Sequence, residues 1–471
     1  MSSLTLLEQL QPDRSAAVPL TRQLAAGLRS LSASGQLPAG AQLPPTRQLA
    51  AALGISRGTV TEVFETLCAE GYLEAQVGAG TFVRALPAAG RDRGRPSARA
   101  QALAQLPVLA SPSTQGGPPR PLRHSQPDAR LFPWKTWARL EAQASWAPAR
   151  RSSAAGWPPL REQVAAYLRR ERGLDCQPEQ VIITTGSQQA LDLAARTLLD
   201  QEEQVALESP GYPGTRAAML GAGLRPLALP VDEAGLDPAA LWRQPRLRMV
   251  GVTPAHQFPT GVSLSPGRRL ELLRWAEEQG GWILEDDYDS EYRYAGPPLT
   301  PLQALSDRVI HLGTFSAFLF SGLRLGFLVV PLHLAGTFTA VKQAMDGGSS
   351  LHDSATLARF MAEGHFTRHL ARTRRIYAAR HDFLLAQVQA LGATVPAPGR
   401  GLHLTAYWPS RQQAQVLRQA PGLGLDLTPV QAFQWGRQTN VPGLLLGFAA
   451  STPGELQEAL GRLALALSSA R

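Results

Sequence analysis

A run of nine residues, 111–119, constrains the fold of this chain more than any other feature. Its sequence, Ser-Pro-Ser-Thr-Gln-Gly-Gly-Pro-Pro, cannot form the interior of a helix or strand, because each proline removes a backbone donor and fixes φ. The surrounding residues, 85–121, are rich in Ala, Pro, Gly and Arg and show no sustained apolar periodicity. We therefore predict a linker over 85–121, between a small domain at 1–84 and a larger one at 122–471.

The net charge of +9 is distributed unevenly along the chain. Arginines and acids balance over residues 1–84, whereas residues 85–124 hold six arginines and one aspartate. More than half of the excess positive charge therefore lies in one short segment. This segment is either a solvated tether or a basic arm that adds non-specific contacts to nucleic-acid phosphates, and the two roles are compatible.

The sequence shows no sign of a membrane or secreted protein. The longest apolar runs, such as residues 327–331, have the length of a strand and are too short to span a membrane. The first residues lack the basic start and the long apolar core of a signal peptide. Two cysteines, Cys68 and Cys176, are too few for a disulfide scaffold, which is typical of a reducing compartment. We expect a cytoplasmic protein.

The first domain shows a compact pattern of helices followed by a hairpin. Two short helices are joined by a tight turn at Gly54, and Ser56 is a typical N-cap for the second of them. This arrangement is helix-turn-helix geometry, and the hairpin that follows it would form a wing. The predicted helices cover residues 19–31, 46–53 and 56–69, and the predicted hairpin strands cover 72–75 and 81–84.

This domain closely resembles the winged helix of GntR-type bacterial regulators. The resemblance implies sequence-specific binding to double-stranded DNA. It implies that Arg47 contacts a phosphate and that Ser56, Arg57 and Thr59 face the major groove, while Gly80 lets the wing approach closely. The motifs that carry the resemblance lie at residues 43–47, 54–60, 70–73 and 80–83.

In the second domain, strand-sized apolar runs alternate with helical patterns, as an α/β domain with a mostly parallel sheet requires. Polar loops follow these runs, and ligands of open α/β sheets bind at the carboxyl ends of the strands. A glycine turn at residue 186 exposes backbone amides at a helix N-terminus, which suits a phosphate. The predicted strands cover 181–185, 247–252, 282–285 and 308–312, and the notable loops cover 209–214, 256–261 and 285–291.

These loops, together with residues 313–326, resemble in the same order the aminotransferase-like domain of the MocR/GabR regulators. The resemblance spans about residues 122–471. It implies the fold of the fold-type I pyridoxal-phosphate enzymes, with a smaller C-terminal α+β subdomain from about residue 365. It also implies a homodimer, because sites of this fold are built at a subunit interface.

The resemblance implies a role for each of seven residues toward pyridoxal phosphate. Asp286 would pair with the pyridine nitrogen, Tyr288 with the phenolic oxygen, and Tyr212 would stack on the ring. The phosphate would be surrounded by Ser187, Gln188, Thr314 and Arg324.

Ala317 stands where this motif carries the lysine that forms the Schiff base with the cofactor. A methyl group can neither form that bond nor move the substrate proton. The chain has only two lysines, Lys135 and Lys342, and neither lies in a matching motif. Arginine cannot substitute, because its guanidinium stays protonated. We therefore expect pyridoxal phosphate to bind non-covalently if it binds, and catalysis to be lost.

Further departures accompany Ala317. Phe318 and Phe320 replace the small or polar residues that are usual there, and we expect them to fill space near the ring. Leu445 stands where many fold-type I members place an arginine for the substrate carboxylate.

We infer a bacterial transcriptional regulator, with no enzymatic activity, whose large domain responds to a small-molecule effector by changing the spacing of two winged helices. Two alternatives stay open: an active aminotransferase fused to a DNA-binding module, and a large domain that serves only as a dimerisation scaffold. His365 and His369 could share one helix face, but neither an HExxH pattern nor a third zinc ligand accompanies them, so we expect no metal.

Overall fold

The computed structural model describes residues 3–85, 95–106, 120–144, 153–294, 296, 299–396, 399–436 and 442–468. These residues form two compact units, and the boundary between them lies between Pro96 and Ser97. Across the described segments, no helix combines the length and the apolar character needed to cross a membrane.

The first unit is a helical domain with a hairpin, as the sequence predicts. Its core is formed by leucines and valines that recur on the inner faces of the helices, among them Leu24, Leu49 and Val60. The turn between the helices Thr46–Leu53 and Arg57–Ala69 is made by Gly54, which has a φ of 63°. The elements are α1 (Ser3–Leu7), α2 (Leu20–Ala33), α3 (Thr46–Leu53), α4 (Arg57–Ala69), and the antiparallel pair β1 (Leu73–Gln76) and β2 (Gly80–Val83).

The second unit is built on an eight-stranded sheet with the order β3-β10-β9-β8-β7-β4-β5-β6. Neighbouring strands from β9 to β5 are parallel, whereas β10 and β6 pair antiparallel with their neighbours. The strands are β3 (Val181–Thr184), β4 (Gln204–Ser209), β5 (Arg225–Asp232), β6 (Gly235–Leu236), β7 (Leu247–Val252), β8 (Trp282–Asp287), β9 (Val309–Thr314) and β10 (Gly326–Val329).

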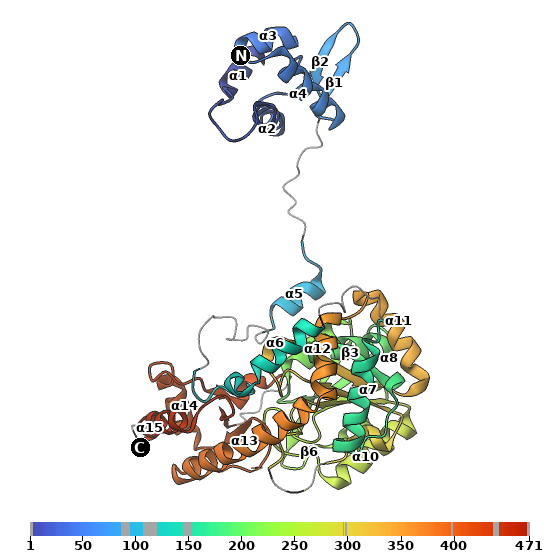
Figure 1. The fold of residues 1–471 in the computed structure, drawn as a ribbon, viewed down its shortest axis with the longest axis vertical. Helices are drawn as coiled ribbons and strands as arrows, with labels where there is room; N and C mark the ends of the chain where they lie inside the picture. The colour runs from blue at the N-terminus through green and yellow to red at the C-terminus, as the bar shows by residue number, and fades with distance from the viewer. Residues whose placement is uncertain are drawn as a thin grey trace. The chain divides into compact units, whose positions relative to one another are not determined.

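Helices cover both faces of this sheet (Figure 1). Alternate residues of one strand point to opposite faces, so Leu207 of β4 packs in one apolar cluster and Ala206 in another. The first cluster includes residues of α8 and α11, and the second includes residues of α10. The helices of this part are α6 (Trp134–Gln143), α7 (Pro158–Tyr167), α8 (Gly186–Leu198), α9 (Pro213–Gly221), α10 (Pro266–Gln279) and α11 (Ala335–Asp346).

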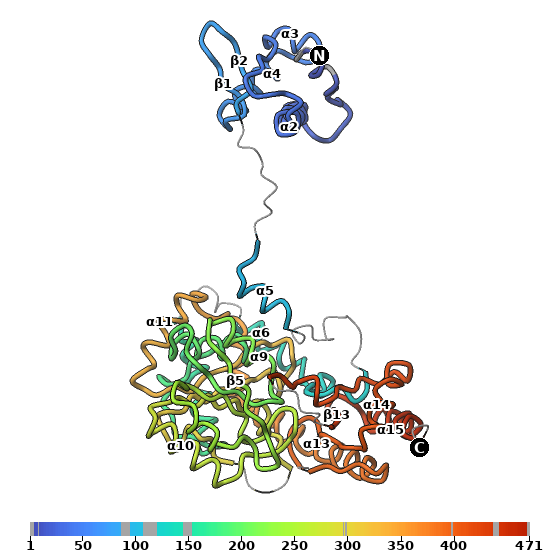
Figure 2. Tube along the Cα trace, turned by 180° about the vertical axis from the view of Figure 1, so that it is seen from behind, coloured from blue at the N-terminus to red at the C-terminus, as the bar shows by residue number. Residues whose placement is uncertain are grey.

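The C-terminal part carries a second, smaller sheet with the order β11-β13-β12, all antiparallel. Figure 2 shows β13 beside α13, α14 and α15, which agrees with the α+β character expected of this part. The elements are α12 (Leu351–Ala362), α13 (His365–Ala390), β11 (His403–Ala406), α14 (Ser410–Gln419), β12 (Thr428–Pro429), β13 (Leu444–Gly447) and α15 (Pro453–Ser468).

A short helix, α5 (Ala98–Ala104), lies within the range expected to be a linker, and it belongs to the second unit. Ser97 caps it, because its Oγ accepts a hydrogen bond from the Ala100 amide at 3.2 Å. The helix contacts the end of α9: Leu103 Cδ1 would be 3.8 Å from a Cβ at Gly221. Residues 107–119, with the proline-rich run, lie outside the described residues.

Candidate functional site

The helix-turn-helix of the first unit carries four of the five predicted DNA-binding residues. Arg47 on α3 and Arg57 on α4 are exposed, and Arg57 Nε lies 3.4 Å from Thr46 Oγ1. Ser56 caps α4, because its Oγ accepts a hydrogen bond from the Thr59 amide at 3.1 Å. The hydroxyls of Ser56 and Thr59 are also 2.8 Å apart. The two arginines are therefore presented to solvent, whereas the hydroxyl pair already has local partners.

Gly80 at the start of β2 is required by the hairpin itself. Its φ is 114°, a conformation that L side chains rarely adopt. A Cβ there would lie 2.8 Å from Gln42 Nε2, which donates to the Ala79 carbonyl at 2.6 Å. The conformation of the hairpin therefore requires a glycine at this position, in addition to the close approach of the wing to DNA that the sequence predicts.

In the second unit, the predicted cofactor residues gather at one edge of the large sheet. Parallel strands bring their carboxyl ends to the same edge, and members of the group lie at or just after the ends of four strands. Tyr212 follows β4, Asp286 lies at the end of β8, and Thr314 ends β9. Ser187 and Gln188 lie in the first turn of α8, directly after β3.

Asp286 is a buried carboxyl whose Oδ1 has no hydrogen-bond partner among the described residues. Burial raises its pKa to about 7, with smaller contributions from the nearby carboxylates of Asp287 and Glu208. A buried acceptor without a partner is costly, and a ring N–H is the kind of donor that would satisfy it. This carboxyl therefore fits the pyridine nitrogen of pyridoxal phosphate.

Tyr288, two residues further on, is held by its neighbours. Its hydroxyl lies 3.1 Å from His256 Nδ1, and the same nitrogen lies 3.0 Å from both carboxylate oxygens of Asp289. Burial raises the pKa of Tyr288 well above its usual range, and the Asp289 and Asp286 carboxyls add to this. Tyr288 is therefore a protonated phenol, which can donate a hydrogen bond to a ring oxygen.

Arg324 lies where α8 begins. Its guanidinium is 3.1 Å from the position that a Cβ would take at Gly186, the first residue of that helix. Arg324 has a φ of 52°, in the left-handed region, which is uncommon for a residue with a side chain. A cation and free amides at the N-terminus of a 13-residue helix suit a phosphate dianion.

Tyr212 and Gln188 lie side by side near this helix end. A Cβ at Gly214 would be 2.4 Å from Tyr212 Cε1 and 2.5 Å from Gln188 Oε1. Gln188 Nε2 donates to the Gly214 carbonyl at 2.9 Å, and Tyr212 as a whole residue is 40% exposed. The tyrosine thus presents an open ring face, whereas the Gln188 amide is partly used in holding α9.

The hydroxyl of Thr314 is occupied by the turn that follows β9. Its Oγ1 accepts a hydrogen bond from the Ser316 amide at 3.2 Å. Ser316 is next to it, and its Oγ is buried with no partner among the described side chains. Sequence reasoning missed Ser316, although it stands directly before Ala317 in the motif.

Ala317 is half-buried in this turn, and both lysines of the chain belong to helices outside it. Lys342 is buried on α11, where its Nζ pairs with Asp346 at 2.7 Å. Lys135 is exposed on α6.

Phe318 and Phe320, which the sequence predicts to fill space near the ring, pack against the apolar core of the second unit. Phe318 is buried in this core, and Phe320 is partly buried against it. Phe318 contacts Tyr292 at 5.9 Å between ring centroids, and Phe320 contacts Phe132 at 4.8 Å and Trp137 at 5.6 Å. The apolar core offers more area for burial than the polar sheet edge, which explains their direction.

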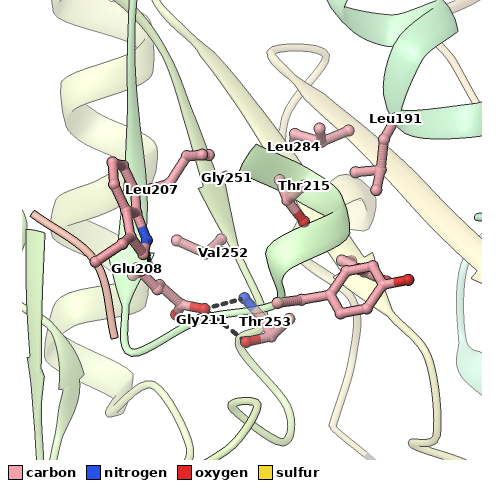
Figure 3. Close-up of a pocket in the computed structure, with 12 residues that line it drawn as sticks. Leu191, Leu207, Glu208, Gly211, Thr215, Gly251, Val252, Thr253 and Leu284 are labelled. Carbon is pink, nitrogen blue, oxygen red and sulfur yellow. Dashed lines mark hydrogen bonds between the residues drawn. The ribbon is translucent and has the colours of Figure 1, made fainter. Parts of the chain in front are cut away.

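Asp286 and Tyr212 belong to the lining of a small, open cleft, and Figure 3 shows its wall at Glu208 and Thr253. Glu208, which sequence reasoning missed, lies in its wall and accepts hydrogen bonds from the Thr253 hydroxyl at 2.6 Å and the Thr253 amide at 3.2 Å. Burial raises the pKa of Glu208 to about 7. The lining residues are Leu191, Leu207, Glu208, Gly211, Tyr212, Thr215, Gly251, Val252, Thr253, Leu284, Asp286 and Trp435.

His365 and His369 do not face a common point. His369 Nε2 lies 3.0 Å from the Phe318 carbonyl in the core, whereas His365 Nε2 lies 3.2 Å from Glu363 at the surface. Over the described ranges, no group of three or more His, Cys, Asp or Glu side chains could hold a metal ion.

Two family models match the chain, one for each unit. "Bacterial regulatory proteins, gntR family" matches residues 20–83, and "Aminotransferase class I and II" matches residues 128–463. Among solved structures, an archaeal alanine:glyoxylate aminotransferase superposes with a TM-score of 0.71 at 25% identity, covering 79% of this chain and 98% of that one. An α-aminoadipate aminotransferase from Thermus thermophilus superposes with a TM-score of 0.67 at 27% identity, covering 81% of this chain and 96% of that one.

Relatives that span nearly the whole chain combine both units. The probable rhizopine catabolism regulatory protein MocR of Rhizobium meliloti is 38% identical over 470 residues, which cover 96% of this chain and 94% of that protein. The HTH-type pyridoxine biosynthesis transcriptional regulator PdxR of Corynebacterium glutamicum is 32% identical over 98% of each. The HTH-type transcriptional regulator TauR of Rhodobacter capsulatus is 34% identical, over 92% of this chain and 93% of that protein. The chain therefore belongs to the MocR-type transcriptional regulators, in which a GntR winged helix precedes an aminotransferase-like domain.

Proposed function

We propose that this regulator binds an operator as a homodimer through Arg47, Ser56, Arg57, Thr59 and the wing at Gly80, and that its large domain binds pyridoxal phosphate without a covalent bond. The domains are 1–84 for DNA binding and 122–471 for effector binding and dimerisation, in a cytoplasmic protein. The large domain acts as a sensor and not as an enzyme.

The observation that carries the sensor role is the pairing of an intact set of binding groups with a missing nucleophile. Asp286 offers an unpaired buried oxygen, and Arg324 lies over the start of α8. Ala317 offers only a methyl group, and the buried Lys342 is held by Asp346. A site with binding groups but no amine retains affinity and loses the chemistry that requires a Schiff base.

Each residue has a definable task in such a site. Pyridoxal phosphate, when bound, supplies an aldehyde on an electron-withdrawing pyridine ring. Asp286 holds the proton at the ring nitrogen, Tyr288 donates its phenol proton to the ring oxygen, and Tyr212 covers the ring. Arg324, Ser187, Gln188 and Thr314 surround the phosphate at the N-terminus of α8.

Calorimetry with pyridoxal phosphate tests this proposal, with Arg324→Ala and the matched surface variant Arg169→Ala measured alongside. We expect saturable binding that is weakened at least about tenfold by Arg324→Ala and left unchanged by Arg169→Ala, because a charge-assisted phosphate contact is worth about 1.5–3 kcal/mol. Borohydride treatment should leave no cofactor attached to the chain. A covalent adduct with steady transamination would instead support an active aminotransferase, and no binding at all would support a dimerisation scaffold.

A further inference from the structure

Beside the cofactor residues lies a buried cluster that we call the aromatic chamber. It has five members, which lie far apart in the sequence, so no sequence motif indicates it: His124, Phe258, His403, Phe433 and Leu445. Phe258 is its centre, with ring centroids 4.8 Å from Phe433, 5.7 Å from His403 and 5.9 Å from His124. The aliphatic side of the chamber is Leu445 on β13, which is completely buried and packs with Phe258 and Phe433.

The chamber adjoins the ring-binding residues. The Phe258 ring lies 6.1 Å from that of Tyr212 and 6.2 Å from that of Tyr288. Tyr288 also packs against the Phe258, Phe433 and Leu445 cluster. Any group carried by a ring bound between Tyr212 and Tyr288 on this side would therefore meet the chamber.

Of the five residues that form the chamber, none carries a positive charge at neutral pH. Burial lowers the pKa of His124 to about 4 and the pKa of His403 well below its usual range, so both imidazoles are neutral at neutral pH. Arg123, the chain neighbour of His124, is in an ion pair with Asp426 at 3.7 Å. His256, whose ring lies 5.1 Å from that of His403, is paired with Asp289.

His403 nevertheless has hydrogen-bonding capacity to spare. Both of its ring nitrogens are buried and make no hydrogen bond of normal geometry with a described residue, although the Pro259 carbonyl is close enough to oppose the lowering of the His403 pKa by burial. The carbonyl of Pro259 nearby already accepts from Thr405 Oγ1 at 2.6 Å. A neutral imidazole has one donor and one acceptor, which matches a neutral polar group such as an amide or hydroxyl.

We infer that the aromatic chamber selects against a carboxylate: the large domain binds a phosphorylated pyridine whose side arm is neutral and rejects the same molecule when that arm ends in a carboxylate. The inference rests on the proposed non-covalent binding of the cofactor. A carboxylate in the chamber would lose its water without gaining a counter-ion. The effector is then the free cofactor or a neutral conjugate of it, and not its conjugate with an amino acid.

Two stable ligands of equal shape test the inference: reduced phosphopyridoxyl-glycine, whose arm ends in a carboxylate, and phosphopyridoxyl-glycinamide, whose arm ends in an amide. Their dissociation constants for the full-length protein are measured by calorimetry, with pyridoxamine phosphate as the ligand without an arm. We expect the glycinamide to bind at least about tenfold more tightly than the glycine adduct, because the desolvated carboxylate stays unpaired. Leu445→Arg should reverse this preference, and Leu445→Met should keep it.

Binding of the glycine and glycinamide adducts to the wild-type protein tests the inference even if the Leu445→Arg variant does not fold. Equal or tighter binding of the glycine adduct would overturn the inference. Binding of pyridoxamine phosphate with loss of both arm-bearing ligands would also overturn it, because exclusion would then follow from volume and not from charge. Failure of pyridoxamine phosphate itself would show that the proposed cofactor site, and with it this inference, is wrong.

Discussion

Replacing Asp286 with asparagine should stabilise the large domain, and the gain should grow with pH. Burial, aided by Asp287 and Glu208, raises the pKa of the Asp286 carboxyl from 3.8 to about 7. The unfolded chain therefore releases this proton at a lower pH than the folded chain does. As the pH rises through this interval, ionisation increasingly favours the unfolded state, and above about pH 7 the difference stays constant.

The size of the effect follows from the same two values. A pKa raised from 3.8 to about 7 corresponds to at most about 4 kcal/mol of lost stability at neutral or higher pH. At about pH 5 the folded carboxyl is still protonated, and the loss should be only about 1.5 kcal/mol. Asparagine keeps the shape and cannot ionise. The stabilisation by Asp286→Asn should therefore increase by about 2–3 kcal/mol between about pH 5 and pH 8.

Urea unfolding followed by tryptophan fluorescence measures this difference in one domain only, because all nine tryptophans lie between residues 134 and 435. Asp175→Asn is the control, since the Asp175 side chain is 88% exposed and should change stability by less than about 0.5 kcal/mol. A gain that is the same at both pH values, or a loss at the higher one, would refute the reasoning from burial.

The remaining predictions concern DNA, covalent chemistry and assembly. Arg57→Ala should reduce the discrimination between bases in competition binding assays by about 1–3 kcal/mol. Equal discrimination by the variant and the wild type would show that Arg57 does not contact the bases. Neutralising the arginines of residues 85–124 should reduce the slope of log affinity against log salt by about one for each phosphate that the arm no longer neutralises, and an unchanged slope would contradict a basic arm. Ala317→Lys should form a borohydride-trapped adduct with pyridoxal phosphate, because the lysine restores the amine that a Schiff base requires, yet steady transamination should stay absent since Leu445 supplies no cation. Sedimentation at micromolar concentration should show a dimer, and a monomer both with and without DNA would exclude assembly through the large domain.

The fold could be predicted because its signals are local. The strand at 247–252 was readable as an apolar run between polar loops, and Ser56 was readable as an N-cap before an apolar-periodic segment. Even α5 had a signal: Ser97 precedes a run of Ala, Arg, Gln and Leu, all good helix formers. The linker composition around it concealed this signal.

The interior of the site could be predicted only in part, because its contacts join distant residues. Trp435 donates a hydrogen bond from Nε1 to the Glu208 carbonyl at 3.1 Å, across 227 positions of the chain. No periodicity in the sequence indicates a contact between two residues so far apart. The direction of Phe318 was equally unreadable, since a side chain just after a turn can point to either side of the sheet edge, and the size of the core on one side decides it.

Because α5 contacts α9, the two ends of helix α9 contact different parts of the second unit. Helix α9 has nine residues and is therefore about 14 Å long. Tyr212 is the N-cap of α9, and Gly221 at the other end of α9 lies against Leu103 of α5. A pivot of about 10° at the tyrosine end would carry the far end through about 2 Å, by the geometry of a lever of that length. Helix α5, the first element of the second unit, thus packs on the far end of a helix that begins at Tyr212, so a movement of Tyr212 would be transmitted to α5.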